Sequence, residues 1–285
     1  MSQVETSHLL PRLLPDRLPL NLRLASAGVT IVIPNWNHEY VLARSIRSAL
    51  KAVKNLHDQG VAAEILVIDD ASQDGSLTLL RQLEAIYFED SLRVLALPQN
   101  VGVVGVRNIA LSQSHYRTIL FMDADNELIP ENTYLFYRAM INTEAAVVYG
   151  NLIHHGPSSQ YLDLFSNESF QPHMLKQNYI DTFALYDKVQ IFDLGGFEEN
   201  LILHGHEDWG LFLHLAACGR KLVFVPALFG IYYDLPESRV KAVKSDQHQK
   251  DRQQYLERVF DQLGVRQHMP LNTQHLRYHP DVGYI

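Results

Sequence analysis

Short apolar runs alternate with longer amphipathic segments from residue 29 onward. The runs consist mainly of aliphatic and β-branched residues: VTIVIP (29–34), EILVID (64–69), RVLAL (93–97), TILFMD (118–123) and AAVVYG (145–150). Nearly continuous apolar character is typical of strands that are buried on both faces of a sheet. The pattern therefore predicts a β-strand at each of these positions.

The segments between these strands have helical periodicity. They cover residues 40–56, 75–88, 101–114 and 131–143. In the first, apolar residues recur at spacings of three and four, which places Leu42, Ile46, Ala49, Leu50 and Val53 on one stripe. Asp74 stands where the N-cap of the second helix is expected. Alternating strands and helices predict parallel βαβ units, and hence an α/β fold with a doubly wound, mostly parallel central sheet flanked by helices.

The alternation changes after residue 150. Residues 151–180 are polar, rich in histidine and without a clear period, so a long irregular connection is expected there. The segment 207–219 predicts a helix, and KLVFVP (221–226) predicts a strand. Pro226 and Gly230 interrupt the apolar run that continues to Tyr233, so we expect a turn after the strand.

Length and pattern together suggest one large domain with an extension at each end. We expect an N-terminal extension at 1–28, an α/β domain at 29–235 and a C-terminal helical extension at 236–285. A charged segment at 237–263 predicts a surface helix in the last of these. The leucines among the prolines of the N-terminal extension could dock on the domain or touch a membrane surface.

Composition narrows the function classes. The net charge of −8 and the pI near 5.9 argue against a nucleic-acid partner, which usually requires a basic surface. The single cysteine, Cys218, excludes an internal disulfide and fits a reducing compartment. No apolar run reaches the length of a membrane span. We therefore expect a cytoplasmic protein, with peripheral contact at the inner membrane face still open.

Paired carboxylates follow two of the predicted strands. Asp69 and Asp70 end the second strand, and Asp123 and Asp125 end the fourth. Carboxyl ends of parallel strands form the ligand-binding edge of such sheets. Because alternate residues on a strand point the same way, we expect both carboxylates of Asp123 and Asp125 to project from one side of its end. At about 5 Å they would repel by roughly 3 kcal/mol. A cation should offset this repulsion, whereas Asp69 and Asp70 could instead only form a turn and cap a helix.

Several segments resemble successive blocks of the inverting glycosyltransferases of family two. They are TIVIPNWNHEYVLARSIRSAL, EILVIDDASQDGS, NVGVVGVRNIAL, ILFMDADN and GFEENLILHGHEDWGLFLHLAACG, and together they span roughly residues 29–235. The resemblance implies a GT-A fold and transfer of a sugar from a nucleotide-sugar donor, with UDP favoured as the nucleotide. It also implies a nucleotide-binding half at 29–126 and an acceptor half at 127–235.

The resemblance assigns the donor site to residues at the sheet edge. Asp70 would accept a hydrogen bond from the nucleobase, and Trp36 would stand where the family usually has a tyrosine. Arg107 and Asn108 would face the diphosphate or ribose, although Arg107 could equally lie on a solvated helix face. The residues implied in donor binding are Pro34, Asn35, Trp36, Asp70, Arg107, Asn108 and Asp123.

The resemblance also implies a divalent cation, Mn²⁺ or Mg²⁺. Asp125 would be the direct ligand, and Asp123 would either share the metal or approach the ribose. Many relatives have a further histidine ligand, but the comparable stretch here, 231–239, has no histidine. Either Asp234 or Tyr233 replaces it, or the metal relies on Asp125 and phosphate alone.

Asp208 and Glu207 resemble the family's catalytic Glu-Asp pair. Inverting transfer requires a base that removes the proton of the acceptor hydroxyl. The resemblance gives this role to Asp208, and orientation of the acceptor to Glu207. At a predicted helix start, both could instead merely favour the helix dipole. Trp209 could then support a sugar ring or belong to the core.

Two other function classes fit parts of the pattern. One is a catalytically silent GT-A module that binds a nucleotide or a partner. The other is a sugar-1-phosphate nucleotidyltransferase, which would favour a Gly-rich basic loop where this chain has PNWNHEYVLARS. A dinucleotide-binding oxidoreductase lacks support, since no GxGxxG follows the first strand. The acceptor stays open among saccharides, lipid-linked carriers and other hydroxyl compounds.

Overall fold

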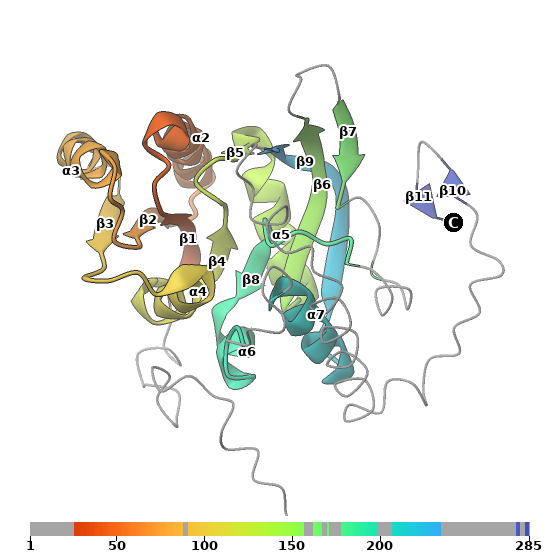
Figure 1. Ribbon diagram of the computed structural model, residues 1–285. Helices are drawn as coiled ribbons and strands as arrows, with labels where there is room; N and C mark the ends of the chain where they lie inside the picture. The colour runs from red at the N-terminus through yellow and green to blue at the C-terminus, as the bar shows by residue number, and fades with distance from the viewer. Residues whose placement is uncertain are drawn as a thin grey trace, which may run out of the picture.

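A mixed β-sheet forms the centre of the protein (Figure 1). The computed structural model describes residues 26–87, 91–156, 162–166, 170, 178–198, 207–234, 278–279 and 283–284. The order of the strands in the sheet is β3-β2-β1-β4-β8-β6-β9-β5, with β7 paired to β6. Their bounds are β1 Ser26–Asn35, β2 Ala63–Asp69, β3 Leu92–Ala96, β4 Tyr116–Phe121, β5 Glu127–Leu128, β6 Val147–His155, β7 Leu162–Phe165, β8 Leu185–Asp187 and β9 Leu222–Tyr233. A separate pair joins β10 (Tyr278–His279) to β11 (Gly283–Tyr284).

The long strands of the sheet all run in one direction. β1 pairs in parallel with β2 and β4, β2 pairs in parallel with β3, and β6 pairs in parallel with β9. The short strands β5, β7 and β8 run antiparallel to their neighbours. The prediction of a mostly parallel α/β sheet is therefore confirmed, and the carboxyl ends of β1, β2 and β4 meet at one edge.

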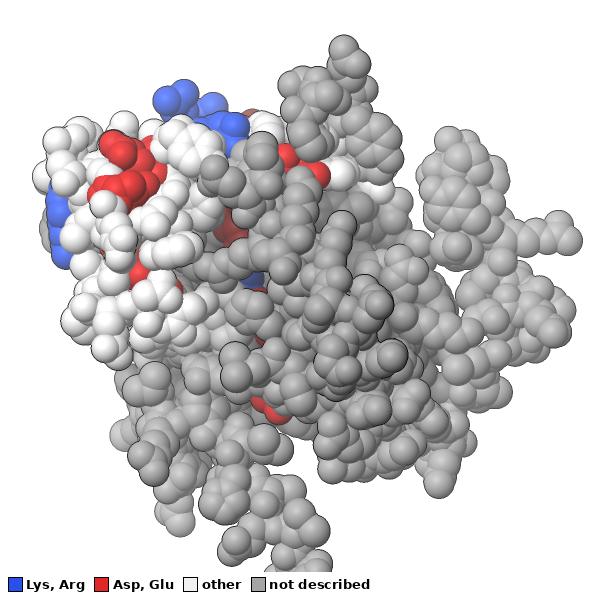
Figure 2. Space-filling model, viewed as in Figure 1, with Lys and Arg blue, Asp and Glu red and all other residues white. Residues whose placement is uncertain are grey.

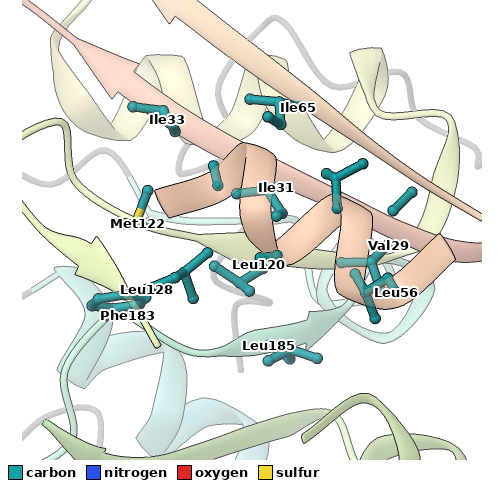
Figure 3. Close-up of a cluster of buried hydrophobic side chains, with 14 of the residues drawn as sticks. Val29, Ile31, Ile33, Leu56, Ile65, Leu120, Met122, Leu128, Phe183 and Leu185 are labelled. Carbon is teal, nitrogen blue, oxygen red and sulfur yellow. The ribbon is translucent and has the colours of Figure 1, made fainter. Parts of the chain in front are cut away.

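Helices cover both faces of this sheet. One apolar cluster joins it to α2 (Glu39–Asp58), α3 (Ser76–Tyr87) and α5 (Thr133–Thr143), which follows the short 3₁₀ helix η2 (Pro130–Asn132). The other joins it to α4 (Gly102–Gln113), α6 (Lys188–Asp193) and α7 (Glu207–Ala217). Figure 3 shows Val29, Ile31 and Ile33 of β1 in the first cluster with Leu56 of α2. Each such side chain, once fully buried, contributes about 1.5–3 kcal/mol.

Side-chain caps fix the starts of α2 and α3 against each other. Asp74 accepts a hydrogen bond from the backbone N–H of Ser76 at 2.9 Å, as expected of a cap, and another from Glu39 at 3.1 Å. The carboxylate of Glu39 in turn accepts the N–H of Gly75 at 2.9 Å. These bonds satisfy donors that the first turn of each helix leaves free. Both helix starts therefore stay close to the binding edge of the sheet.

Two predictions about the second half of the chain are wrong. Residues 151–180 are not irregular throughout, because β6 continues to His155 and β7 follows it. β6 pairs with β7 on one side and with β9 on the other, and this pairing satisfies the backbone hydrogen bonds of its polar residues. β9 does not end at Pro226 but continues to Tyr233, because the pairing register with β6 shifts after Gly150 and accommodates the proline there. The short elements β8 and α6 were not predicted.

Other predictions lie outside the described residues. The helix expected at 237–263 is one of them, as are most of the two extensions. Within the described part of the chain, no helix has both the length and the apolar character needed to cross a membrane. In the view of Figure 2, acidic and basic side chains lie near one another over the α2 and α3 end, and the described surface shows no broad basic patch.

Gly150 tests the close packing of β6 against α5. A Cβ built on Gly150 would lie 2.9 Å from the carbonyl oxygen of Ala227 and closer still to the buried ring of Phe136. We expect Gly150→Ala to lower the free energy of unfolding by about 1–3 kcal/mol through overpacking. Thermal unfolding measures this, at roughly 2–4 °C per kcal/mol.

Gly60→Asn is the matched control, because its surroundings are open and asparagine tolerates the left-handed backbone that Gly60 adopts. A loss at Gly150 no larger than the loss at Gly60 would contradict the packing argument.

Candidate active site

The buried guanidinium of Arg107 joins two acidic motifs that are far apart in the sequence. Arg107 extends from α4 and is only 4% exposed. Its Nη1 donates to Oε1 of Glu207 at 2.9 Å, and its Nη2 lies 3.6 Å from Oδ1 of Asp123. Burial alone would lower the pKa of Arg107, but the carboxylates of Asp123 and Glu207 outweigh it and raise the pKa. The alternative that Arg107 lies on a solvated helix face is therefore wrong.

The Asp123–Asp125 motif lies in a turn and not at the end of a strand. β4 ends at Phe121, and the N–H of Asn126 donates to the carbonyl of Asp123 at 3.1 Å. The expectation that strand alternation aligns the two carboxylates is thus wrong. They nevertheless interact: burial, and then the charge of Asp123, raises the pKa of Asp125 to about 7. The negative charges of the two carboxylates therefore destabilise each other.

A second arginine, which the sequence analysis did not single out, lies beside this turn. Nη2 of Arg44 donates to the carbonyl of Asp125 at 2.6 Å, and its guanidinium stacks 3.7 Å from the ring centroid of Tyr233. Nε of Arg44 lies 3.3 Å from Oε1 of Glu127, which also accepts from the hydroxyl of Tyr233 at 2.7 Å. Arg44 and Arg107 therefore supply part of the positive charge that the two aspartates require. An arginine on an amphipathic helix gives no sequence signal for this role.

The turn that holds Asp123 and Asp125 fits a divalent cation whose remaining ligands come from phosphate. Among the described residues, no group of three or more His, Cys, Asp or Glu side chains could hold a metal ion. Mg²⁺ is typically held by one or two carboxylates together with substrate phosphates, which Asp123 and Asp125 can match. Tyr233 is a poor additional ligand, because burial and its bond to Glu127 raise its pKa to about 12 and keep the phenol protonated.

Most of the aspartates and asparagines predicted to bind the donor already form hydrogen bonds with other residues of the chain. The two carboxylate oxygens of Asp70 accept from the N–H groups of Val101 (2.7 Å) and Gly102 (2.9 Å), so Asp70 caps α4. Asp69 accepts from Asn35 at 2.8 Å and from the hydroxyl of Ser72 at 2.6 Å. Helix capping and turn formation therefore do occur here, and Asp70, which is 2% exposed, has one acceptor position of each oxygen in use.

The remaining predicted donor residues differ in exposure. Trp36 is 40% exposed just beyond the end of β1, whereas Pro34 and Asn35 are buried in that strand. Both amide atoms of Asn108 bond to the backbone of Phe197 at 2.8 Å, which gives Asn108 a structural partner on the chain. Of these residues, Trp36 offers the open surface that a nucleotide could contact.

Asp208 lies in an environment that suits a general base. Burial and the neighbouring charge of Glu207 raise its pKa to about 6. Its Oδ1 accepts the N–H of Trp209 at 2.7 Å, and side chains from the segment before β8 contact its Oδ2. Trp209 is only 4% exposed and belongs to the core, which leaves little of its ring to support a sugar. Glu207 and Asp208 do start α7, but the bond of Glu207 to Arg107 goes beyond a dipole effect.

Comparison with known proteins identifies the family. The family model described as glycosyl transferase family 2 matches residues 30–196. The chain belongs to this family. This family 2 chain is 28% identical over 188 residues to the glycosyltransferase AglE of Haloferax volcanii, an alignment that covers 64% of this chain. The chain spans 59% of the length of AglE.

Solved structures of low sequence identity share the fold. S. aureus TarS in complex with UDP-GlcNAc superposes with a TM-score of 0.60 at 16% identity, covering 87% of this chain and 77% of TarS. The mannosyltransferase PcManGT from Pyrobaculum calidifontis, in complex with GDP-Man and Mn²⁺, gives 0.58 at 15% identity, covering 81% and 69%. The GT-A fold expected for this family 2 chain is therefore confirmed.

Arg107→Met tests the contribution of the buried ion pair. It would leave Glu207 without its cation, and removing one partner of a buried pair costs about 3–5 kcal/mol. The control is Arg81→Met, which removes a half-exposed arginine paired with the partly exposed Glu84 at 2.6 Å and should cost about 1 kcal/mol or less. Urea unfolding compares the two variants, and equal losses would show that the Arg107 pair has no special weight.

Proposed function

We propose that this chain is an inverting glycosyltransferase that transfers a sugar from a UDP-sugar to a hydroxyl acceptor. Asp208 acts as the base, and Asp123 and Asp125 hold a divalent cation, Mn²⁺ or Mg²⁺. The observation that carries the proposal is the position of Arg107, whose guanidinium lies 3.6 Å from Asp123 and 2.9 Å from Glu207. Arg107 thus contacts both Asp123, which belongs to the proposed cation site, and Glu207, which precedes the proposed base Asp208.

The residues support direct displacement. Asp208, with its pKa raised to about 6, removes the proton of the acceptor hydroxyl as the oxygen attacks the anomeric carbon. The bond to the diphosphate oxygen breaks on the opposite face, and the nucleoside diphosphate leaves with that electron pair. A cation bound at Asp123 and Asp125 would neutralise charge on the departing diphosphate. Glu207, held by Arg107, orients the acceptor side of the site.

The donor class follows from the sheet edge and from similar proteins. TarS binds UDP-GlcNAc and PcManGT binds GDP-Man with Mn²⁺, so both nucleotides occur on this fold. Asp70, followed in the chain by the Asp123–Asp125 motif, favours UDP as the nucleotide here. The family match ends at residue 196, so the role of Asp208 rests on its geometry and on the Glu-Asp resemblance. We also propose a cytoplasmic location, which the free Cys218 supports.

Thermal unfolding with nucleotides tests the donor and the metal together. UDP with Mn²⁺ should raise the unfolding midpoint, since a ligand at about 100 times its Kd adds about 2.7 kcal/mol. GDP, dTDP and CDP, and UDP without metal, should shift it less. Asp125→Ala should abolish the metal-dependent part of the shift, whereas an undiminished shift in that variant would contradict the metal role.

Asp208→Asn tests the base. Transfer should fall at least about a hundredfold, in the range of general-base contributions, while the thermal shift by UDP and Mn²⁺ persists. In the unsubstituted protein, kcat/KM should fall tenfold per pH unit below about 6, because protonation of Asp208 removes the base. Loss of donor binding together with activity in a folded Asp208→Asn protein would contradict this assignment.

A further inference from the structure

Two polar side chains from the segment before β8 hold one oxygen of Asp208. Nδ2 of Asn178 donates to Oδ2 at 3.1 Å, and Oγ1 of Thr182 donates to the same oxygen at 3.3 Å. Together with the N–H of Trp209 on Oδ1, at 2.7 Å, these donors occupy three of the roughly four acceptor positions of a carboxylate. Among the described residues, these donors leave one acceptor position of Asp208, which the hydroxyl of an acceptor would occupy.

The segment that carries these donors is itself fixed. Oδ1 of Asn178 accepts the N–H of Ile180 at 3.2 Å, so its NH₂ group must face Asp208. The carboxylate of Asp181 accepts the N–H of Phe183 at 2.8 Å in a second turn of the same kind. The carbonyl of Ala184 then accepts the N–H of Phe121, at the end of β4, at 3.2 Å. The segment that carries the two donors is therefore held against β4, the strand that precedes the turn at Asp123.

Charged and titratable groups on several elements interact electrostatically with Asp208. Glu207 precedes it on α7, Arg107 extends from α4, Asp181 belongs to the segment before β8, and Tyr186 lies on β8. Burial and Glu207 disfavour the ionised form of Asp208, whereas Arg107 and the bond from Asn178 favour it. Hydrogen bonds to the charged form are thus part of the balance that keeps this carboxylate usable as a base.

We propose that Asn178 and Thr182 are positioning residues for the base. They orient the carboxylate of Asp208 and stabilise its ionised form, so that its free acceptor position faces the incoming hydroxyl. This inference rests on the proposed function, because it requires that Asp208 act as the base. Neither residue was singled out from the sequence, because Asn178 lies at the end of the polar segment 151–180, which has no periodicity, and Thr182 directly follows this segment.

The first test compares Thr182→Val, which removes the hydroxyl at constant shape, with Thr182→Ser, which retains it. The probe is transfer to water from UDP-GlcNAc, UDP-glucose or GDP-mannose with Mn²⁺, followed as release of nucleoside diphosphate across pH. Thr182→Val and Asn178→Ala should move the acid limb of kcat/KM upward by about one pH unit, and kcat should fall about tenfold. The KM for the donor and the profile of Thr182→Ser should stay near those of the unsubstituted protein.

A second measurement does not depend on turnover. In metal-free protein with ¹³C-labelled aspartate carboxyl groups, the signal of Asp208 is assigned by its loss in Asp208→Asn, and its titration midpoint is followed. The midpoint should rise by about one unit in Thr182→Val and in Asn178→Ala, but not in Thr182→Ser. Circular dichroism confirms that each variant is folded, and the two substitutions lie on different side chains, so one can replace the other.

The outcomes separate this inference from the proposed function. If Asp208→Asn is inactive but the acid limb and the ¹³C midpoint stay in place in both variants, the positioning role is wrong and the base assignment stands. The same holds if kcat falls without any pH shift, or if Thr182→Ser shifts as much as Thr182→Val. If Asp208→Asn keeps its activity, the base assignment is overturned, and the positioning role with it.

Discussion

The ion pairs of Arg107 are the interaction on which the rest of the site depends. Its guanidinium is almost fully buried between Asp123 and Glu207, two residues that lie far apart in the chain. A buried charge without partners would be very unfavourable, so α4, the turn after β4 and the start of α7 must stay together. The constraint that stabilises this region therefore also places the proposed cation site next to the proposed base.

The acidic turn carries a cost that the protein offsets only in part. The pKa of Asp125 is raised because its carboxylate is buried near Asp123, and the charge of Arg44 reduces but does not remove this effect. Such a site gains from a divalent cation brought with a diphosphate. Arg44 donates to the carbonyl of Asp125, and the N–H of Asn126 donates to the carbonyl of Asp123. The side chain of Asn126 in turn accepts the N–H of Tyr233. These bonds hold the turn before any ligand arrives, which limits the ordering needed on binding.

The short strand β8 joins the strands β3-β2-β1-β4 of the sheet to the strands β6-β9-β5. It lies between β4 and β6 and runs antiparallel to both, so the segment before it arrives at the binding edge. This position explains how Asn178 and Thr182 reach Asp208 although they lie 30 and 26 residues away in the chain. A three-residue strand gives almost no sequence signal, which is why this part of the site was not foreseen.

The sequence by itself determined the fold class and the motifs. Buried parallel strands and amphipathic helices leave strong periodic patterns, because each must hide a continuous apolar face. The Asp-Ala-Asp motif follows such a strand, and the Glu-Asp motif begins such a helix. The tertiary structure alone decided what each charge contacts. Arg107 could have faced solvent but is buried, and Asp70 caps α4. Arg44 donates to the carbonyl of Asp125. These contacts join residues that are distant in the chain, and their energies depend on burial, which no local pattern encodes.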